Sequence, residues 1–360
     1  MHGAAEARRR ARVGYARPMS DAGGDPRFVI AADAGGTFSR VGCFALDGSL
    51  LGSATGRGGS PYHQADAAAN VADTTVRALQ DAGRDAADAV ALVAGLAMVS
   101  RAGSNQGDGD NGWADDFFRV PGLRCERLIL NDAVVAHRGA LLGAPGIMVV
   151  TGTGSMILAI DADGTEIESG QFEHYAGAAR HLAYEAVQLI LLGAAGPDDD
   201  EFVAAILRSW GADDVPGLRH VILGLAHVDR MEVRHRFGAL APLVTEAADR
   251  SPLADRALRD LARKTARGVG LLAPLIGGDR VTVSTTGGLA TTPAFTARLA
   301  DALDEDTYAP VALVPAVLDA LRGAALIAYG TVGAATNRSV IDRLRESQQD
   351  VRPDGTVARS

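Results

Sequence analysis

Four short segments of the 360-residue chain, rich in Gly, Thr, Ser, Asn and Asp, come directly after an apolar run. These segments are 33–37 (DAGGT), 131–133 (NDA), 152–155 (GTGS) and 286–288 (TGG). Glycine lets a backbone approach a ligand closely, and successive N–H groups in such turns attract anions. A carboxylate beside bound phosphates serves to hold a divalent cation or to accept a proton. Together the segments predict a nucleotide-phosphate site with Asp33 and Asp132 as its reactive carboxylates, although any one segment alone is typical of an ordinary tight turn.

The elements that must position these segments alternate between strands and helices. Short apolar runs predict strands, and longer runs with a helical period predict helices. The strands are expected at 28–32, 40–46, 50–53, 89–96, 127–130, 146–150, 156–160, 281–284 and 311–314, and the helices at 65–82, 134–142, 178–192, 199–210, 233–249, 252–275, 292–301 and 317–331. This alternation in both halves of the chain indicates an α/β fold. Ligands of such folds bind at the carboxyl ends of strands, which is where the four segments fall.

The charge balance and the rare residue types exclude several classes of protein. The chain has 35 basic and 44 acidic side chains and a net charge of -9, which argues against a nucleic-acid partner. Lys264 is the only lysine, so the chain has no P-loop, in which a lysine follows the glycines. Cys43 and Cys125 stand far apart without metal-ligand spacing, which is typical of reduced cysteines in a cytoplasmic protein. No apolar run is long enough to predict a membrane span.

The two ends of the sequence differ from the rest in composition. Residues 1–27 carry six arginines against three acidic residues and have no apolar signal-peptide core. We expect a disordered basic leader there, and an arm that binds nucleic acid is the alternative. At the other end we expect a helix up to residue 345 and a flexible tail over 346–360.

In order and spacing, the segments DAGGTFSR (33–40), NDA, GTGS and TGG resemble those of the actin-like ATPase superfamily over residues 28–332. Within it, the chain is most similar to the group of N-acetylglucosamine kinases and BadF/BadG/BcrA/BcrD ATPases. The resemblance implies two ribonuclease H-like domains, 28–134 and 135–335, with ATP and Mg²⁺ in a central nucleotide cleft. It also implies that a C-terminal helix, 317–345, packs back on the first domain. Members of this group are often dimers, so a homodimer is a hypothesis here.

The same resemblance gives roles to individual residues. Asp33 would hold Mg²⁺ through water, and Asp132 would be the general base that accepts the proton of the attacking hydroxyl. The other residues expected around the nucleotide are Gly35, Gly36, Thr37 and Arg40 in the first loop, Gly152, Thr153, Gly154 and Ser155 in the second, and Gly287 and Gly288 beside the adenosine. The alternative role for Asp132 is a helix N-cap, because Asn131 or Asp132 begins the helix that follows.

The acceptor side departs from the pattern of N-acetylglucosamine kinases. Tyr62 stands where the group carries Asn after the first hairpin, Met156 stands where another Asn is usual, and the segment 172–180 lacks the group's acidic pair. We therefore expect an acceptor other than N-acetylglucosamine itself, such as another amino sugar, an N-acetylhexosamine analogue or a cyclitol. The candidate contacts are Ser60, Tyr62, His63, Asn131, Glu173, His174, Tyr175 and Arg180. The alternative for each is an ordinary polar residue of the surface.

Three functions are consistent with these observations. The first is an ATP-dependent kinase of a small hydroxylated metabolite. The second is a non-catalytic or regulatory ATP-binding protein with an altered acceptor site. The third is a BadF-type ATPase that activates a radical dehydratase. Such activators hold an iron–sulfur cluster through paired cysteines, and neither Cys43 nor Cys125 is placed for that role.

Overall fold

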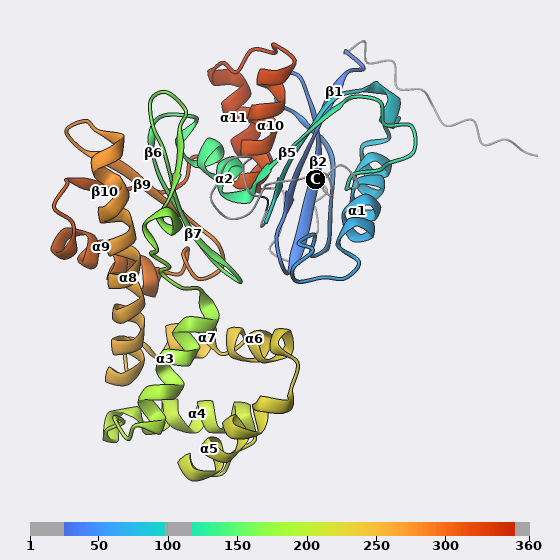
Figure 1. Cartoon of the computed structure of the whole chain (residues 1–360). Coiled ribbons are helices and arrows are strands. Elements are labelled where there is room, and N and C mark those ends of the chain that lie inside the picture. Colours follow the sequence, from blue (N-terminus) through green and yellow to red (C-terminus); the bar gives the residue numbers. More distant parts are fainter. Residues whose placement is uncertain (1–24, 98, 100–116, 350–360) are drawn as a thin grey trace, which may run out of the picture.

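Two five-stranded sheets form the framework of the molecule (Figure 1). The computed structural model describes residues 25–97, 99 and 117–349. The first sheet has the strand order β3-β2-β1-β4-β5, and the second has the order β10-β9-β6-β7-β8. The strands are β1 (Phe28–Ala34), β2 (Phe38–Ala45), β3 (Leu50–Arg57), β4 (Ala89–Leu96) and β5 (Glu126–Asn131) in the first sheet, and β6 (Gly146–Thr151), β7 (Ser155–Ile160), β8 (Glu166–Glu168), β9 (Val281–Thr286) and β10 (Val311–Leu313) in the second. The α/β architecture predicted from the sequence is confirmed.

Parallel pairing brings the carboxyl ends of several strands to one edge of each sheet. In the first sheet β1 pairs with β4 and β4 pairs with β5 in parallel, so that Asp33 lies opposite Gly95 and Leu96 lies opposite Asn131. In the second sheet β6 pairs in parallel with β9 and antiparallel with the short return strand β7. The four segments singled out in the sequence therefore lie at the carboxyl ends of strands: two follow β1 and β5 of the first sheet, and two follow β6 and β9 of the second.

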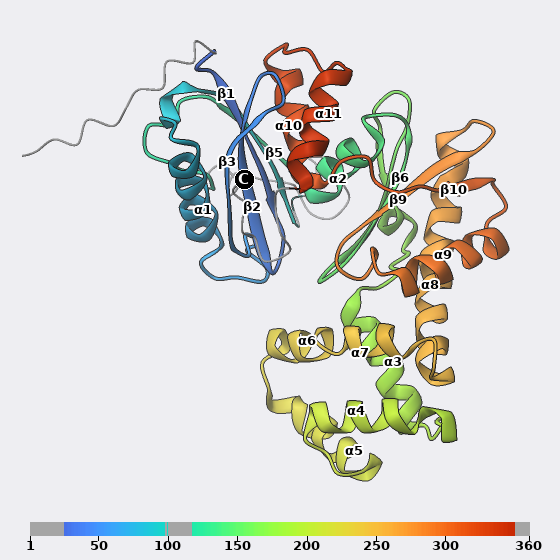
Figure 2. The same cartoon turned by 180° about the vertical axis from the view of Figure 1, so that it is seen from behind.

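Helices cover the first sheet from both sides (Figures 1 and 2). Helix α1 (Ala67–Ala82) contacts β2 and β3, and α10 (Ala320–Thr331) contacts β1 and β4. The last helix, α11 (Arg338–Gln349), lies beside α10. Helix α2 (Asp132–Leu141) contacts α10 and also strand β6 of the second sheet. The α2–α10 pair therefore joins the two sheets.

The second sheet carries a larger set of helices. Helices α3 (Ala179–Leu191), α8 (Pro252–Ile276) and α9 (Pro293–Asp306) share one hydrophobic core with it. Four shorter helices project away from both sheets in Figure 1: α4 (Asp200–Trp210), α5 (Val215–Gly224), α6 (Arg230–Gly238) and α7 (Ala241–Ala247). Among the described residues, no helix has both the length and the apolar character needed to cross a bilayer.

The structure corrects several boundaries predicted from the sequence. The helix expected at 233–249 is two helices, α6 and α7, with Pro242 in the first turn of the second one. Helix α5 and strand β8 were not predicted. The helix expected at 317–345 is also two helices, and Gly333 between them has a φ of +67°. Because α11 continues to Gln349, residues 346–349 are helical and not part of a flexible tail. The expected leader falls, except for 25–27, outside the described residues, as does the remainder of the tail.

Two glycines allow α2 and α10 to touch backbone to backbone. A Cβ atom at Gly323 would lie 1.9 Å from the carbonyl oxygen of Val135 and 2.6 Å from the amide of Gly139. A Cβ atom at Gly139 would lie 2.3 Å from the carbonyl oxygen of Asp319. No side chain fits at either position without moving the helices apart.

We predict that Gly323→Ala lowers the free energy of unfolding by about 2 kcal/mol or more, because overpacking a close contact forces backbone movement. Urea unfolding measures this change. Gly330→Ala in the same helix is the matched control, since no atom lies within 4 Å of its added Cβ. The control is expected to be neutral or to stabilise the protein by up to about 1 kcal/mol. Equal losses in both variants would contradict the proposed close contact.

Candidate active site

The first glycine loop follows β1 and is held by the chain around residue 60. The amides of Gly59 and Ser60 donate to the carbonyl of Gly35 at 3.0 and 3.2 Å. The imidazole of His63 lies against Gly36, where a Cβ atom would be 3.0 Å from its Nδ1. The same Nδ1 is 3.0 Å from the buried hydroxyl of Ser60. Ser60 therefore orients His63 against the loop.

The second glycine loop is held by three neighbouring segments. The amide of Ala179, at the start of α3, donates to the carbonyl of Gly152 at 3.1 Å. Arg180 Nη1 donates to the carbonyl of Thr153 at 3.0 Å. Gly287 has a φ of +103° and lies so close to the carbonyl of Thr151 that a Cβ atom would be 2.6 Å from it. Only glycine fits here, which explains one residue of the TGG segment.

The two loops face each other, and one hydrogen bond joins them. Thr37 Oγ1 lies 2.9 Å from Thr153 Oγ1. Within the described residues, no protein group accepts a hydrogen bond from the amides of Gly36, Thr37, Thr153 or Gly154. Exposed amides on facing turns are suited to bind the oxygens of a phosphate chain.

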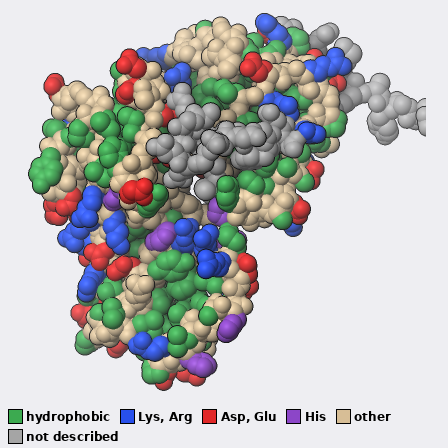
Figure 3. Space-filling model, in the orientation of Figure 1, with side chains coloured by type: hydrophobic (Ala, Val, Ile, Leu, Met, Phe, Trp, Pro, Cys, Tyr) green, Lys and Arg blue, Asp and Glu red, His purple; other side chains and the backbone are tan. Residues whose placement is uncertain are grey.

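A cavity of about 990 Å³ opens beside this contact. Its volume is at the upper end of the range usual for small-molecule sites. One wall comes from the loops and the other from α6, α7 and the start of α9, including Gly36, Thr37, His63, Gly152, Thr153, Arg180, Arg234, His235, Glu246, Asp249, Gly288 and Leu289. The cavity thus lies between the two sheets and the projecting helices, where Figure 3 shows Arg, Lys and His side chains gathered.

Positive charge concentrates where the glycine loops and α6 line this cavity. Burial, followed by the charges of His235, Arg180 and Arg234, lowers the pKa of His63. Burial and the charge of Arg234 also lower the pKa of Arg180. In the part of the chain that the structure describes, neither Arg180 nor Arg234 forms an ion pair with a carboxylate. An anionic ligand would supply the missing counter-charge.

Asp132 lies at the first position of α2, and Asn131 caps that helix. Asn131 Oδ1 accepts from the amide of Ala133 at 2.9 Å, and Asn131 Nδ2 donates to the carbonyl of Val99 at 2.8 Å. Asn131 therefore fills the N-cap role that the sequence left open between the two residues. Burial, and then the negative charge of Asp33, raise the pKa of Asp132 to about 7. A half-buried carboxyl with such a pKa is suited to exchange protons near neutral pH.

The residues fit a magnesium ion held jointly with a nucleotide. Among the described residues, no cluster of three or more His, Cys, Asp or Glu side chains could enclose a metal ion. Mg²⁺ usually binds one or two protein carboxylates and completes its shell with phosphate and water oxygens. Asp33 at the end of β1 provides such a carboxylate beside the first loop.

The structure brings together some of the predicted residues and separates others. The glycine loops and His63 line the cavity, whereas Arg40 lies between the carboxylates of Asp33 and Asp319. Tyr62 is 61% exposed, and Glu173 and Tyr175 are also exposed and do not line the cavity. His174 Nε2 is 2.7 Å from the carbonyl of Lys264, so the ring packs against α8. The acceptor contacts therefore stay predictions.

The helical wall of the cavity was not predicted from the sequence. Arg234 and His235 lie on α6, in a segment that has no glycine-bearing motif. The one available signal is the basic run RMEVRHR at 230–236. Such a run is more commonly a solvated helix face.

Comparison with known proteins identifies the family. The model of the BadF/BadG/BcrA/BcrD ATPase family matches residues 32–328. The chain belongs to this family. Among curated proteins, none gives a significant match.

Solved structures share the fold of this BadF-family chain. A Chromobacterium violaceum protein, provisionally named an N-acetylglucosamine kinase, is 27% identical with a TM-score of 0.63, over 84% of this chain and 98% of that one. A similarly named Porphyromonas gingivalis protein is 16% identical with a TM-score of 0.59, over 84% and 99%. A ROK-family glucokinase from Streptomyces griseus, in complex with glucose and AMPPNP, is 19% identical with a TM-score of 0.58, over 84% and 99%. The predicted two-domain actin-like ATPase fold is confirmed.

We predict that Asp132→Asn stabilises the ligand-free protein more at pH 8 than at pH 4. The folded-state pKa is about 7 and the ordinary value is 3.8, so Asp132 lowers stability progressively as pH rises between these values. The difference in stabilisation should be on the order of 2 kcal/mol, because one pKa unit corresponds to about 1.4 kcal/mol and residual solvent access reduces the effect. Urea unfolding at both pH values measures it, with the exposed Asp73→Asn as control. An equal gain at both pH values would show that Asp132 is not perturbed.

Proposed function

We propose that this BadF-family chain is an ATP-dependent kinase that transfers the γ-phosphate to a hydroxyl of a small sugar-like metabolite. The observation that carries the proposal is the pair of facing glycine loops, joined by Thr37 and Thr153, next to two carboxylates of unequal environment. Phosphoryl transfer needs phosphate positioning, charge neutralisation and one base, and this arrangement offers all three.

The loops and the positive side chains would hold the triphosphate. The free amides of Gly36, Thr37, Thr153 and Gly154 are available to bind phosphate oxygens. Mg²⁺ at Asp33, when bound, neutralises charge on the transferring phosphate. Arg180, fixed on the carbonyl of Thr153, adds positive charge at the same place.

Asp132 would act as the general base. Asn131, and not Asp132, is the N-cap of α2. Its pKa of about 7 allows the carboxylate to accept a proton from a substrate hydroxyl at neutral pH. Asp33 lies near the end of β1, and Asp132 directly follows β5. Both strands run parallel to β4, so the two carboxylates lie at the same edge of the first sheet.

Two observations support the proposed class of acceptor: the similarity to a solved structure and the residues at positions 62 and 156. The Chromobacterium violaceum protein carries an N-acetylglucosamine kinase name and shares 27% identity. Tyr62 and Met156 replace the Asn residues typical of that activity. An N-acetylhexosamine analogue, another amino sugar or a cyclitol is therefore the proposed acceptor.

The activator alternative has less support. Cys43 is buried in β2, and burial raises the pKa of its thiol to about 12. Cys125 is partly buried, and burial raises its thiol pKa too. Iron–sulfur clusters bind thiolates, which both environments disfavour.

We predict that Asp132→Asn lowers phosphotransfer by a factor of roughly 100 or more and changes ATP binding less than about threefold. A panel of sugars, amino sugars and cyclitols with Mg-ATP, followed by ADP release, identifies the acceptor first. For the unmodified protein, kcat/KM should fall as pH decreases below about 7, because Asp132 becomes protonated. Full turnover by the variant would exclude Asp132 as the base, and no turnover with any acceptor would favour the non-catalytic alternative.

We further predict that Arg180→Gln and Arg234→Gln each weaken ATP binding about three- to tenfold, with little effect on adenosine binding, because they remove positive charge beside the phosphate loops. Calorimetric titration with each ligand measures this. Arg236→Gln is the matched control on α6, since Arg236 stacks on Trp210 at 4.7 Å and does not line the cavity. An equal loss for ATP and adenosine would place these arginines away from the phosphates.

A further inference from the structure

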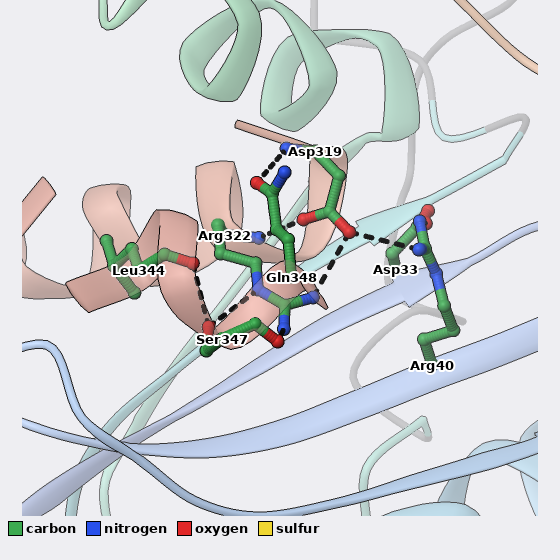
Figure 4. Close-up of polar contacts among 7 residues, drawn as sticks. All are labelled: Asp33, Arg40, Asp319, Arg322, Leu344, Ser347 and Gln348. Carbon is green, nitrogen blue, oxygen red and sulfur yellow. Dashed lines mark hydrogen bonds and ion pairs between the residues drawn. The ribbon is translucent and has the colours of Figure 1, made fainter. Parts of the chain in front are cut away.

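Arg40 connects the first glycine loop to a distant part of the chain. On strand β2, its Nη2 lies 2.6 Å from Asp33 Oδ2 and its Nη1 lies 3.0 Å from Asp319 Oδ2 (Figure 4). Asp319 is 279 residues further along and caps the N-terminus of α10. The Arg40 side chain is 28% exposed, so both ion pairs are partly shielded from water. One guanidinium thus ties two carboxylates together.

Asp319 is itself fixed by neighbouring groups. Its Oδ1 accepts from the amide of Arg322 at 3.0 Å, and its Oδ2 accepts from Arg322 Nη1 at 3.1 Å. Its own amide donates to Gln348 Oε1 at 2.9 Å. These contacts hold the Asp319 carboxylate in place between Arg40 and Arg322 (Figure 4).

The helix α11 anchors this arrangement from the far side. Arg322 is only 1% exposed and donates from Nε to Ser347 Oγ at 3.1 Å and from Nη2 to the carbonyl of Ser347. Ser347 and Gln348 both belong to α11. The last turns of α11 thus contact Asp319 directly through Gln348 and indirectly through Arg322.

We propose that Asp319 and helix α11 position Arg40, and through it Asp33, so that one oxygen of Asp33 stays available to Mg²⁺-nucleotide. In the described residues, Asp33 Oδ1 accepts no side-chain hydrogen bond, while Oδ2 is held by Arg40. Without Asp319, both nitrogens of the guanidinium fork are free to bind both oxygens of Asp33, as Arg–carboxylate pairs prefer. Arg40 would then compete with the metal ion. This inference rests on one part of the proposed function, the role of Asp33 in binding Mg²⁺-nucleotide.

The positioning role can be separated from the docking of α11. Helix α11 has a second anchor, in which Arg343 Nη1 pairs with Asp47 Oδ2 at 2.6 Å in the β2–β3 turn. Val340 and Leu344 of α11 also join the core of the first sheet. Asp47→Asn therefore weakens docking without removing a partner of Asp319 or Arg40, and it serves as the matched control.

The test compares Asp319→Asn with Asp47→Asn by calorimetric titration of ATP at a series of Mg²⁺ concentrations, together with the melting temperature of the nucleotide-free protein. Asp319→Asn should raise the Mg²⁺ concentration for half-maximal enhancement of ATP binding about tenfold, the effect of one charge-assisted hydrogen bond. Binding of ATP without Mg²⁺ should be unchanged. Asp47→Asn should lower the melting temperature and leave the Mg²⁺ dependence as it is.

Two further variants keep the test decisive. Gln348→Ala removes a single contact from α11 to Asp319 and should shift the Mg²⁺ dependence in the same direction by about two- to threefold, even if Asp319→Asn does not fold. Arg40→Lys keeps the charge but loses the fork and should fall between Asp319→Asn and the unmodified protein. Unchanged Mg²⁺ dependence in all three variants would overturn the proposal. Normal Mg-ATP binding without transfer to any acceptor would instead refute the kinase function and leave this inference intact.

Discussion

The contact between α2 and α10 is the constraint on which the site depends. Gly139 and Gly323 let these helices meet at backbone distance, and the amides of Val317 and Leu318 donate to the carbonyls of Ala140 and Gly139. Helix α10 packs on β1 and β4, while α2 packs on β6. One shared core therefore joins both sheets, and their glycine loops face each other because that core fixes the relation between them.

Charge is distributed unevenly around this core. Near Asp33 and Asp319, the carboxylates are paired with Arg40 and Arg322. Around the glycine loops, by contrast, Arg180 is held by a backbone carbonyl and has no carboxylate partner in the described residues. The carboxylates at Asp33 and Asp319 are thus neutralised by arginines, whereas positive charge remains beside the glycine loops, where an anionic ligand would bind.

The glycine-bearing loops were predictable because their chemistry is local. A turn that must expose amides and approach a ligand requires glycine, and the sequence shows it directly at 35–36, 152–154 and 287–288. The α6–α7 wall was not predictable, because a helix is positioned by tertiary packing and Arg234 belongs to no motif. Similarly, the pairing of Arg40 with Asp319 depends on the return of α10 to the first sheet, which no local pattern encodes. The candidate acceptor residues at 173–175 do not line this cavity, and His174 packs on α8 through another tertiary contact that no local pattern encodes, so their role stays a prediction.

The hydrogen bond between the hydroxyls of Thr37 and Thr153 is a weak restraint on separation of the two loops. A neutral hydrogen bond between partly exposed side chains contributes only about 1 kcal/mol, so breaking it changes the population of an open form by less than about tenfold. Most of the free energy that opposes separation of the two sheets must then come from the buried contact between α2 and α10. Breaking the Thr37–Thr153 hydrogen bond on ligand entry would therefore cost little, whereas the backbone contact between α2 and α10 would oppose separation of the two sheets.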